Sequence, residues 1–298
     1  MNLEFLQNWF EQLSGGPVTA KLALNRVPGI RLTSAAAADI SLLVHPGAED
    51  HVSRGIRKFG YWEGHETRLL VGNVNPGDVI LDVGANIGYH TVLFGALAGP
   101  KGRVIAFEPA ADNYCLLNRN IARNGLENVE TMAAAVCDKA GVLGLRRHDE
   151  SSGAHTLADV EQAGFSKTLL VPTLRLDDLP IDRVDFIKID IQGAELLALD
   201  GARGLIEKNR SRLRMLLEYN VAIYVKAGAR DQAIAHLERL RSAFSIQFCD
   251  PTIGDFYPLD MSSEEFIDMA AGGQRKLPDG RDWTSAVGYS DLWLTPRA

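Results

Sequence analysis

The chain has 298 residues, of which 46% are hydrophobic and 23% charged, the composition of an ordinary soluble globular protein. Its formal net charge of −7 argues against sequence-independent nucleic-acid binding, which neutralises phosphates with a basic face. The three cysteines lie far apart, no signal peptide is evident, and no apolar run approaches the roughly 20 residues that span a bilayer. We therefore expect a cytoplasmic protein with neither a disulfide framework nor a membrane span.

The first 50 residues are weakly patterned. Apolar residues at near-helical spacing from Leu3 to Leu13 predict a helix, and Gly15-Gly16-Pro17 ends it. This helix could be a docking helix, a lid over a site, or a contact in a homo-oligomer, and the sequence leaves all three open.

From Ile80 onward, short β-branched runs alternate with helical stretches, which indicates βαβ units and a mainly parallel sheet. The first half predicts strands at 79–83, 103–107 and 129–136 and helices at 91–97 and 113–124. Two strand-like pieces, 142–145 and 169–174, predict an inserted hairpin. The second half predicts strands at 184–190, 214–219, 245–248 and 291–294 and a helix at 231–244. The long connection from Cys249 to Ser290 should hold a short helix, opened by a capping box of Ser262 and Glu265.

The strongest motif is the turn Gly84-Ala85-Asn86-Ile87-Gly88, which directly follows the strand ending in Asp82-Val83. In open α/β sheets, ligands bind past the carboxyl ends of the strands, where this turn would lie. Gly84 would let the backbone approach a ligand, and Gly88 would let the next helix begin close to the strand. Glu108 ends the second strand, 24 positions after Gly84, a spacing that suits an acid bound to a ribose diol.

The choice of an adenosine cofactor depends on charge and space. A dinucleotide turn has glycine where this chain has Asn86, because the pyrophosphate needs the room. The expected strand ends carry the acids Asp82, Glu108, Asp138 and Asp190. They would repel a pyrophosphate and attract the two cations of S-adenosylmethionine (AdoMet), each charge pair contributing roughly 1–4 kcal/mol. The pattern favours AdoMet over NAD, and an NAD(P)-dependent oxidoreductase remains the alternative.

These stretches resemble the FkbM family of methyltransferases over residues 56–219. The matching segments are 61–63 (YWE), 76–89 (PGDVILDVGANIGY), 106–109 (AFEP), 135–138 (AVCD) and 184–195 (VDFIKIDIQGAE). The family prefers Glu where this chain has Gln192, which puts in doubt any role needing a carboxylate there. A non-catalytic AdoMet-binding protein is therefore a further alternative.

The resemblance implies an AdoMet-dependent methyltransferase domain at 56–298, preceded by an extension at 1–55. It implies a Rossmann-like class I fold: a seven-stranded, mainly parallel sheet in the order 3-2-1-4-5-7-6, with helices on both faces. The acceptor would be a hydroxyl of a small molecule, such as a polyketide-type natural product, or of a glycan or glycolipid sugar.

An alcohol acceptor needs its proton removed as it attacks, so a general base is expected. Asp190 is the first candidate, although it could instead bind the cofactor or cap a helix. His155, on a polar loop, is the second. Lys188 alternates with Asp190 on one strand, so it could orient Asp190 or bind an acceptor oxygen. Glu63, beside Trp62, could close over the cofactor, and no metal-type cluster is evident.

Overall fold

The computed structural model describes residues 16–32, 37, 39–47, 50–148, 155–157, 165–249, 254–273, 276–277, 279–283 and 288–297. The helix expected from Leu3 to Leu13 and the loop residues 151–154 lie outside this set. The chain divides into two compact units. Unit 1 comprises Met1–Ala135, Gly144–His155 and Gly164–Pro172, and unit 2 comprises Val136–Leu143, Thr156–Ala163 and Thr173–Ala298. A domain boundary at residue 55 stays a prediction.

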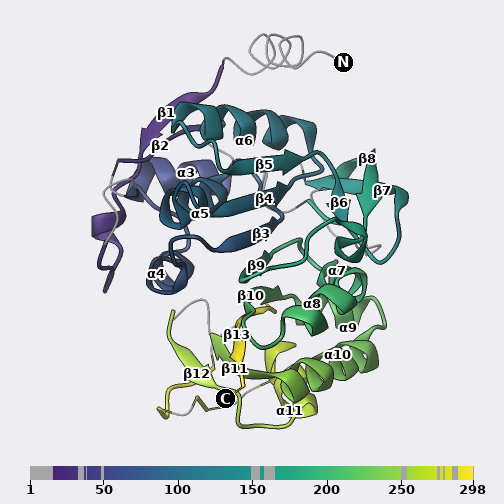
Figure 1. Ribbon diagram of the computed structural model, residues 1–298. Helices are drawn as coiled ribbons and strands as arrows, with labels where there is room; N and C mark the ends of the chain where they lie inside the picture. The colour runs from purple at the N-terminus through teal and green to yellow at the C-terminus, as the bar shows by residue number, and fades with distance from the viewer. Residues whose placement is uncertain are drawn as a thin grey trace. The chain divides into compact units, whose positions relative to one another are not determined.

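The sheet of unit 1 consists of three parallel strands in the order β3-β4-β5 (Figure 1). The strands are β3 (Val79–Val83), β4 (Arg103–Phe107) and β5 (Val129–Met132). Helix α5 (Tyr89–Ala98) connects β3 to β4, and α6 (Ala111–Arg123) connects β4 to β5. All of α5 is buried, as its almost wholly apolar sequence requires. The predicted βαβ pattern is confirmed, and the register brings the carboxyl ends of β3 and β4 to one edge.

The region before β3 holds structure that its weak pattern did not predict. β1 (Val18–Lys21) pairs antiparallel with β2 (Ser41–Val44), and a 3-10 turn (Leu24–Arg26), α3 (His51–Phe59) and α4 (Gly64–Asn73) complete it. Side chains of α6 act as a strand partner for β2. Asn120 accepts from the Leu43 N–H at 2.6 Å and donates to the Leu43 carbonyl at 2.9 Å, and Asn124 does the same for Ser41 at 3.1 and 2.9 Å.

The inserted hairpin is confirmed as β7 (Gly141–His148) and β8 (Phe165–Leu174), which form a small sheet with β6 (Ala135–Val136) in the order β6-β8-β7. The single strand expected at 129–136 is wrong. The chain bends after Met132, so β5 stays with the parallel strands while β6 joins the hairpin. A continuous run of strand-forming residues does not reveal such a change of partner.

The sheet of unit 2 has the order β9-β10-β13-β11-β12. Its strands are β9 (Phe186–Ile189), β10 (Arg214–Tyr219), β11 (Phe244–Cys249), β12 (Phe256–Pro258) and β13 (Ser290–Pro296). β9 and β10 are parallel, whereas β13 runs antiparallel to β10 and to β11. Unit 1 therefore contains the 3-2-1 part of the expected order and unit 2 the 4-5-7-6 part, with β12 added. The order as a whole stays a prediction.

The helices of unit 2 follow its strands as an α/β fold requires. They are a 3-10 turn (Leu176–Asp178), α7 (Glu195–Gly201), α8 (Arg203–Asn209), α9 (Val221–Lys226), α10 (Arg230–Ala243) and α11 (Ser263–Ala270). The predicted capping box opens α11: Ser262 Oγ accepts from the Glu265 N–H at 3.2 Å, and Glu265 Oε2 accepts from the Ser262 N–H at 2.9 Å. The fold is α/β and Rossmann-like, with an inserted hairpin.

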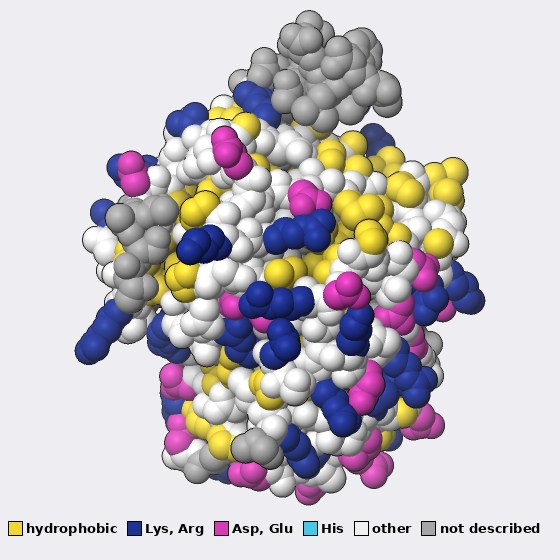
Figure 2. All heavy atoms as spheres, viewed as in Figure 1, with side chains coloured by type: hydrophobic (Ala, Val, Ile, Leu, Met, Phe, Trp, Pro, Cys, Tyr) yellow, Lys and Arg dark blue, Asp and Glu magenta, His cyan; other side chains and the backbone are white. Residues whose placement is uncertain are grey.

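Two surface properties bear on the expected partners. On the face drawn in Figure 2, both Lys and Arg side chains and Asp and Glu side chains are exposed. In the part of the chain that the structure describes, none of the helices combines the length and the apolar character that membrane crossing requires.

Candidate active site

The glycine turn in unit 1 leaves β3 through three residues with positive φ. Gly84 and Gly88 have φ of +88° and +90°, and Asn86 has φ of +51°. Asn tolerates this left-handed region better than most residues, which is why the turn accepts a side chain here. Gly88 also lies close to α6, since a Cβ there would come within 2.7 Å of Leu117 Cδ1. The close approach at Gly88 is therefore to α6, rather than to the strand as expected from the sequence.

Every backbone N–H of this turn already donates a hydrogen bond within the protein. The pairs are Gly84 and Ala85 to the Phe107 carbonyl at 3.1 and 3.0 Å, Asn86 to Glu108 Oε2 at 2.8 Å, Ile87 to Asn86 Oδ1 at 2.6 Å, and Gly88 to the Ala85 carbonyl at 2.9 Å. A pyrophosphate cradle needs such N–H groups to point at the ligand. This turn does not offer them.

Two carboxyl groups flank the turn. Asp82 is fully buried and accepts from Thr91 Oγ1 at 2.5 Å. Glu108 is 5% exposed and accepts from the Asn86 and Ala110 N–H groups, each at 2.8 Å. Burial raises the pKa of Glu108 to about 8, against the lowering effect of these two N–H donors. The predicted placement of both acids beside the turn is what the structure has within unit 1.

A second acidic group in unit 1 was not visible in the sequence. Glu63, Glu66 and His90 each bring one candidate metal-ligand atom into a group whose atoms lie within 4.8 Å of one another. His90 Nε2 is 3.7 Å from Glu66 Oε2, and both side chains are buried. Glu63 begins α4 with a φ of +41°. A helix assigned to 64–73 would have placed Glu63 and Glu66 on one face, but the sequence pattern assigned none there.

His155, also in unit 1, has one ring nitrogen that accepts a hydrogen bond and a second that is placed to donate rather than to act as a base. Its Nδ1 accepts from the His148 N–H at 3.2 Å, so in the neutral ring the proton is on Nε2. Burial lowers the pKa of His155 to about 4, even though the Asp112 charge acts to raise it. Its Nε2 is buried without a hydrogen-bond partner among the described residues. In this tautomer, the Nε2–H group of a neutral His155 can donate a hydrogen bond to an oxygen atom of a bound ligand.

In unit 2, Asp190 follows β9 and both of its oxygens accept hydrogen bonds. Lys188 Nζ, on a side chain only 2% exposed, donates to Oδ2 at 2.9 Å, and Gln192 Nε2 donates to Oδ1 at 2.9 Å. The same Gln192 amide also donates to Glu218 Oε1 at 2.8 Å. A glutamate at position 192 would put a third carboxylate where these two need a donor. The departure at Gln192 is therefore accommodated by its neighbours.

Two further acids belong to unit 2. Glu195 is fully buried and accepts from the Gly193 N–H at 2.8 and 3.0 Å and from Tyr224 Oη at 2.5 Å. Burial raises the pKa of Glu195 to about 7. Its bonds from the Gly193 N–H close the turn after β9, which is a structural role. Asp138 is partly exposed and accepts from Cys137 Sγ at 3.2 Å. Its cofactor role stays a prediction.

The parallel βαβ arrangement with a glycine turn after its first strand defines a Rossmann-like α/β enzyme class. Residues 82–243, more than half of the chain, match the family model described as the methyltransferase FkbM domain. The chain therefore belongs to the FkbM methyltransferase family.

Individual relatives agree with this assignment. Methyltransferase sdnD of Sordaria araneosa is 28% identical over 200 residues, covering 56% of this chain and 74% of the relative. The 31-O-demethyl-FK506 methyltransferase FkbM of Streptomyces tacrolimicus is 28% identical over 185 residues, covering 51% of this chain and 70% of the relative. A solved methyltransferase FkbM from Methylobacillus flagellatus KT aligns at 19% identity with a TM-score of 0.43. That alignment covers 73% of this chain and 43% of the solved chain, so this chain spans less than half of the solved one.

Proposed function

We propose that this methyltransferase moves a methyl group from AdoMet to a hydroxyl oxygen of a saccharide or secondary metabolite. The family supports methyl transfer, and the name of the Streptomyces relative refers to a methylated oxygen. The three cysteines are free and buried. The cytoplasmic location stays an expectation from the sequence. A homo-oligomer remains an expectation from the sequence.

One observation carries the choice of cofactor: the N–H groups from Gly84 to Gly88 are all engaged within the protein. A dinucleotide would have to displace these bonds and bring a pyrophosphate beside the carboxyl groups of Asp82 and Glu108. AdoMet carries no phosphate, so it does not require free backbone N–H groups at this edge of unit 1. The residues present fit AdoMet and do not fit NAD.

The residues proposed to hold AdoMet are Asp82, Gly84, Ala85, Asn86, Gly88 and Glu108, with Glu63, Asp138 and Asp190 as further candidates. When bound, AdoMet supplies a methyl carbon activated by a sulfonium. Glu108 would bind the ribose hydroxyls. Asp190 would take the proton of the acceptor hydroxyl, because its oxygens keep accepting capacity beyond the bonds from Lys188 and Gln192. His155 would donate from Nε2 to an acceptor oxygen.

Calorimetry with AdoMet and fluorescence titration with NADH test the cofactor. We expect AdoMet to bind and NADH not to bind. Asp82→Ala should weaken AdoMet binding about tenfold or more, since it removes a buried carboxyl group that is hydrogen-bonded beside the turn. The exposed Glu130→Gln on β5 is the control and should change affinity by less than twofold. Micromolar NADH binding without AdoMet binding would overturn the proposal.

The acceptor can be found by radiolabelled methyl transfer to fractionated extract of the source cells, followed by identification of the labelled product. With that acceptor, Asp190→Asn should lower kcat about 100-fold and leave the AdoMet Kd within threefold if Asp190 is the base. The control Asp182→Asn breaks only an exposed ion pair with Lys208. Unchanged turnover in Asp190→Asn would remove the residue from this role. Tight AdoMet binding without transfer to any fraction would favour a non-catalytic protein.

A further inference from the structure

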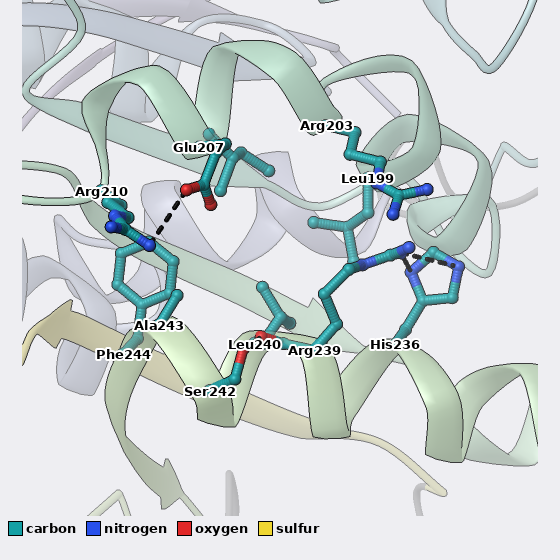
Figure 3. A pocket seen from close by; sticks show the side chains of 11 residues that line it. Leu199, Arg203, Glu207, Arg210, His236, Arg239, Leu240, Ser242, Ala243 and Phe244 are labelled. Atoms are coloured by element: carbon teal, nitrogen blue, oxygen red, sulfur yellow. Dashed lines mark hydrogen bonds and ion pairs between the residues drawn. The ribbon is translucent and has the colours of Figure 1, made fainter.

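Unit 2 contains a cavity of about 300 Å³ between helices α8 and α10 (Figure 3). Its apolar wall comes from Leu199, Ile206, Leu240 and Phe244. All four are buried or half-buried, so the wall is part of the core of unit 2 that reaches the surface here. An apolar wall of this kind suits the hydrocarbon or aromatic part of a small ligand.

The cavity lies at the opposite end of the sheet from Asp190 and Glu218. Phe244 begins β11 and pairs with Pro296, the last residue of β13. β13 runs antiparallel to β10, and its Leu294 pairs with Met215 near the start of β10. Phe244 is therefore at the amino end of β10, whereas Asp190 follows the carboxyl end of β9. The cavity is a separate site within unit 2.

Three arginines surround the cavity, and their partners differ. Arg210 is 3.0 Å from Glu207, and Arg239 Nη2 is 3.2 Å from Asp200 Oδ1. Arg203 is exposed and has neither a hydrogen bond nor an ion pair with any residue that the structure describes. With two acids for three guanidinium groups, the cavity has one positive charge in excess.

Arg239 is held in place by its neighbours rather than free to move. Its Nη2 donates to His236 Nδ1 at 2.7 Å (Figure 3). His236 Nε2 is in turn 3.2 Å from Asp200 Oδ2. Burial lowers the pKa of His236, against the opposing effect of Asp200, and this favours the neutral imidazole at pH 7. Figure 3 shows the guanidinium groups of Arg203 and Arg239 on the same side of the cavity as His236, on which the positive charge of Arg203 also acts. The guanidinium groups of Arg203 and Arg239, beside the buried His236 ring, can therefore bind an anion together.

We propose that this cavity binds a small organic anion, with a phosphate or carboxylate group between Arg203 and Arg239 and an apolar body against Leu240 and Phe244. The excess charge selects the anion, and planar guanidinium groups bind either oxyanion with paired hydrogen bonds. The apolar wall selects an organic ligand over an inorganic ion. This inference does not depend on the proposed methyl transfer.

Calorimetric titration of the whole chain without AdoMet tests this, with four probes: phenyl phosphate, benzoate, inorganic phosphate and benzyl alcohol. We expect phenyl phosphate or benzoate to bind, and the stronger of the two identifies the head group. Inorganic phosphate should bind at least tenfold more weakly, because it lacks the apolar body, and benzyl alcohol should not bind measurably. Equal binding of inorganic and phenyl phosphate, or no binding of either organic anion, would overturn the proposal.

Arg203→Gln assigns the binding to this cavity. It should weaken the better organic anion about tenfold without loss of stability, since Arg203 is exposed. The matched control is Arg212→Gln, which removes the same charge from an exposed position that does not line the cavity. Equal weakening in the two variants would mean general charge attraction and would also refute the site.

Discussion

The substitution Glu108→Gln should make the folded protein slightly less stable at acid pH and more stable at alkaline pH. In the cofactor-free protein, Glu108 is 5% exposed and accepts the N–H groups of Asn86 and Ala110. Burial raises its pKa to about 8, from 4.5 for a free glutamic acid. The folded protein therefore keeps this proton over a pH range in which the unfolded chain has lost it.

The size of the effect follows from that range. Below pH 4.5 both states hold the proton. As pH rises from 4.5 to 8, the folded state binds more protons than the unfolded state, so the wild type loses stability. At 1.36 kcal/mol for each pH unit between the two pKa values, the loss is on the order of 5 kcal/mol. Glutamine cannot ionise, so the Glu108→Gln variant does not lose this stability as pH rises. Its NH2 group must, however, face one backbone N–H, at a cost of about 1 kcal/mol.

Urea unfolding at pH 5, 7 and 9, followed by tryptophan fluorescence, measures the free energy of unfolding. The Glu108→Gln variant should be slightly less stable than the wild type at pH 5 and several kcal/mol more stable at pH 9. The control is Glu130→Gln. Arg103 lowers the pKa of the exposed Glu130, so removing this carboxylate should give no gain in stability at alkaline pH. Parallel stability profiles for Glu108→Gln and the wild type would refute the argument.

Gln192→Glu should lower the free energy of unfolding by about 2–4 kcal/mol at pH 8, because it replaces a donor by a third carboxylate beside Asp190 and Glu218. The loss should shrink at pH 5, and an equal loss at both pH values would contradict this. Asn86→Ala should cost about 2 kcal/mol, from the positive φ and the lost side-chain bond, whereas Asn86→Gly should cost under 1 kcal/mol in the same urea assay. Ser262→Ala should cost about 1 kcal/mol and speed amide hydrogen exchange in the first turn of α11; unchanged exchange would count against the cap.

The fold was predictable where local pattern and tertiary structure agree. The limits of β3 and β10 match their predicted ranges because each is a buried apolar run bounded by turn residues. The β1–β2 pair was not predictable. β2 is held by Asn120 and Asn124 of α6, about 80 residues away in the chain, and no local periodicity signals such contacts.

The sequence predicts which residues lie at the candidate site, but it does not predict the hydrogen bonds between their side chains. The positions of Asp82 and Glu108 at strand ends follow from the βαβ pattern. By contrast, the bridging of Asp190 and Glu218 by Gln192 depends on side-chain geometry after two different strands. From the sequence alone, Gln192 is the loss of a charge, whereas in the fold its amide supplies the donor that Asp190 and Glu218 share.

Asn86 shows why a pattern argument and a structural argument can agree for different reasons. The sequence suggested that its side chain occupies the space of a pyrophosphate. In the structure its side chain accepts the Ile87 N–H, and its own N–H is held by Glu108. Glycine at position 86 would free only the first of these N–H groups, because Glu108 would still hold the second. The preference against a dinucleotide thus depends on two residues from neighbouring strand ends, and a single change at Asn86 does not create a phosphate cradle.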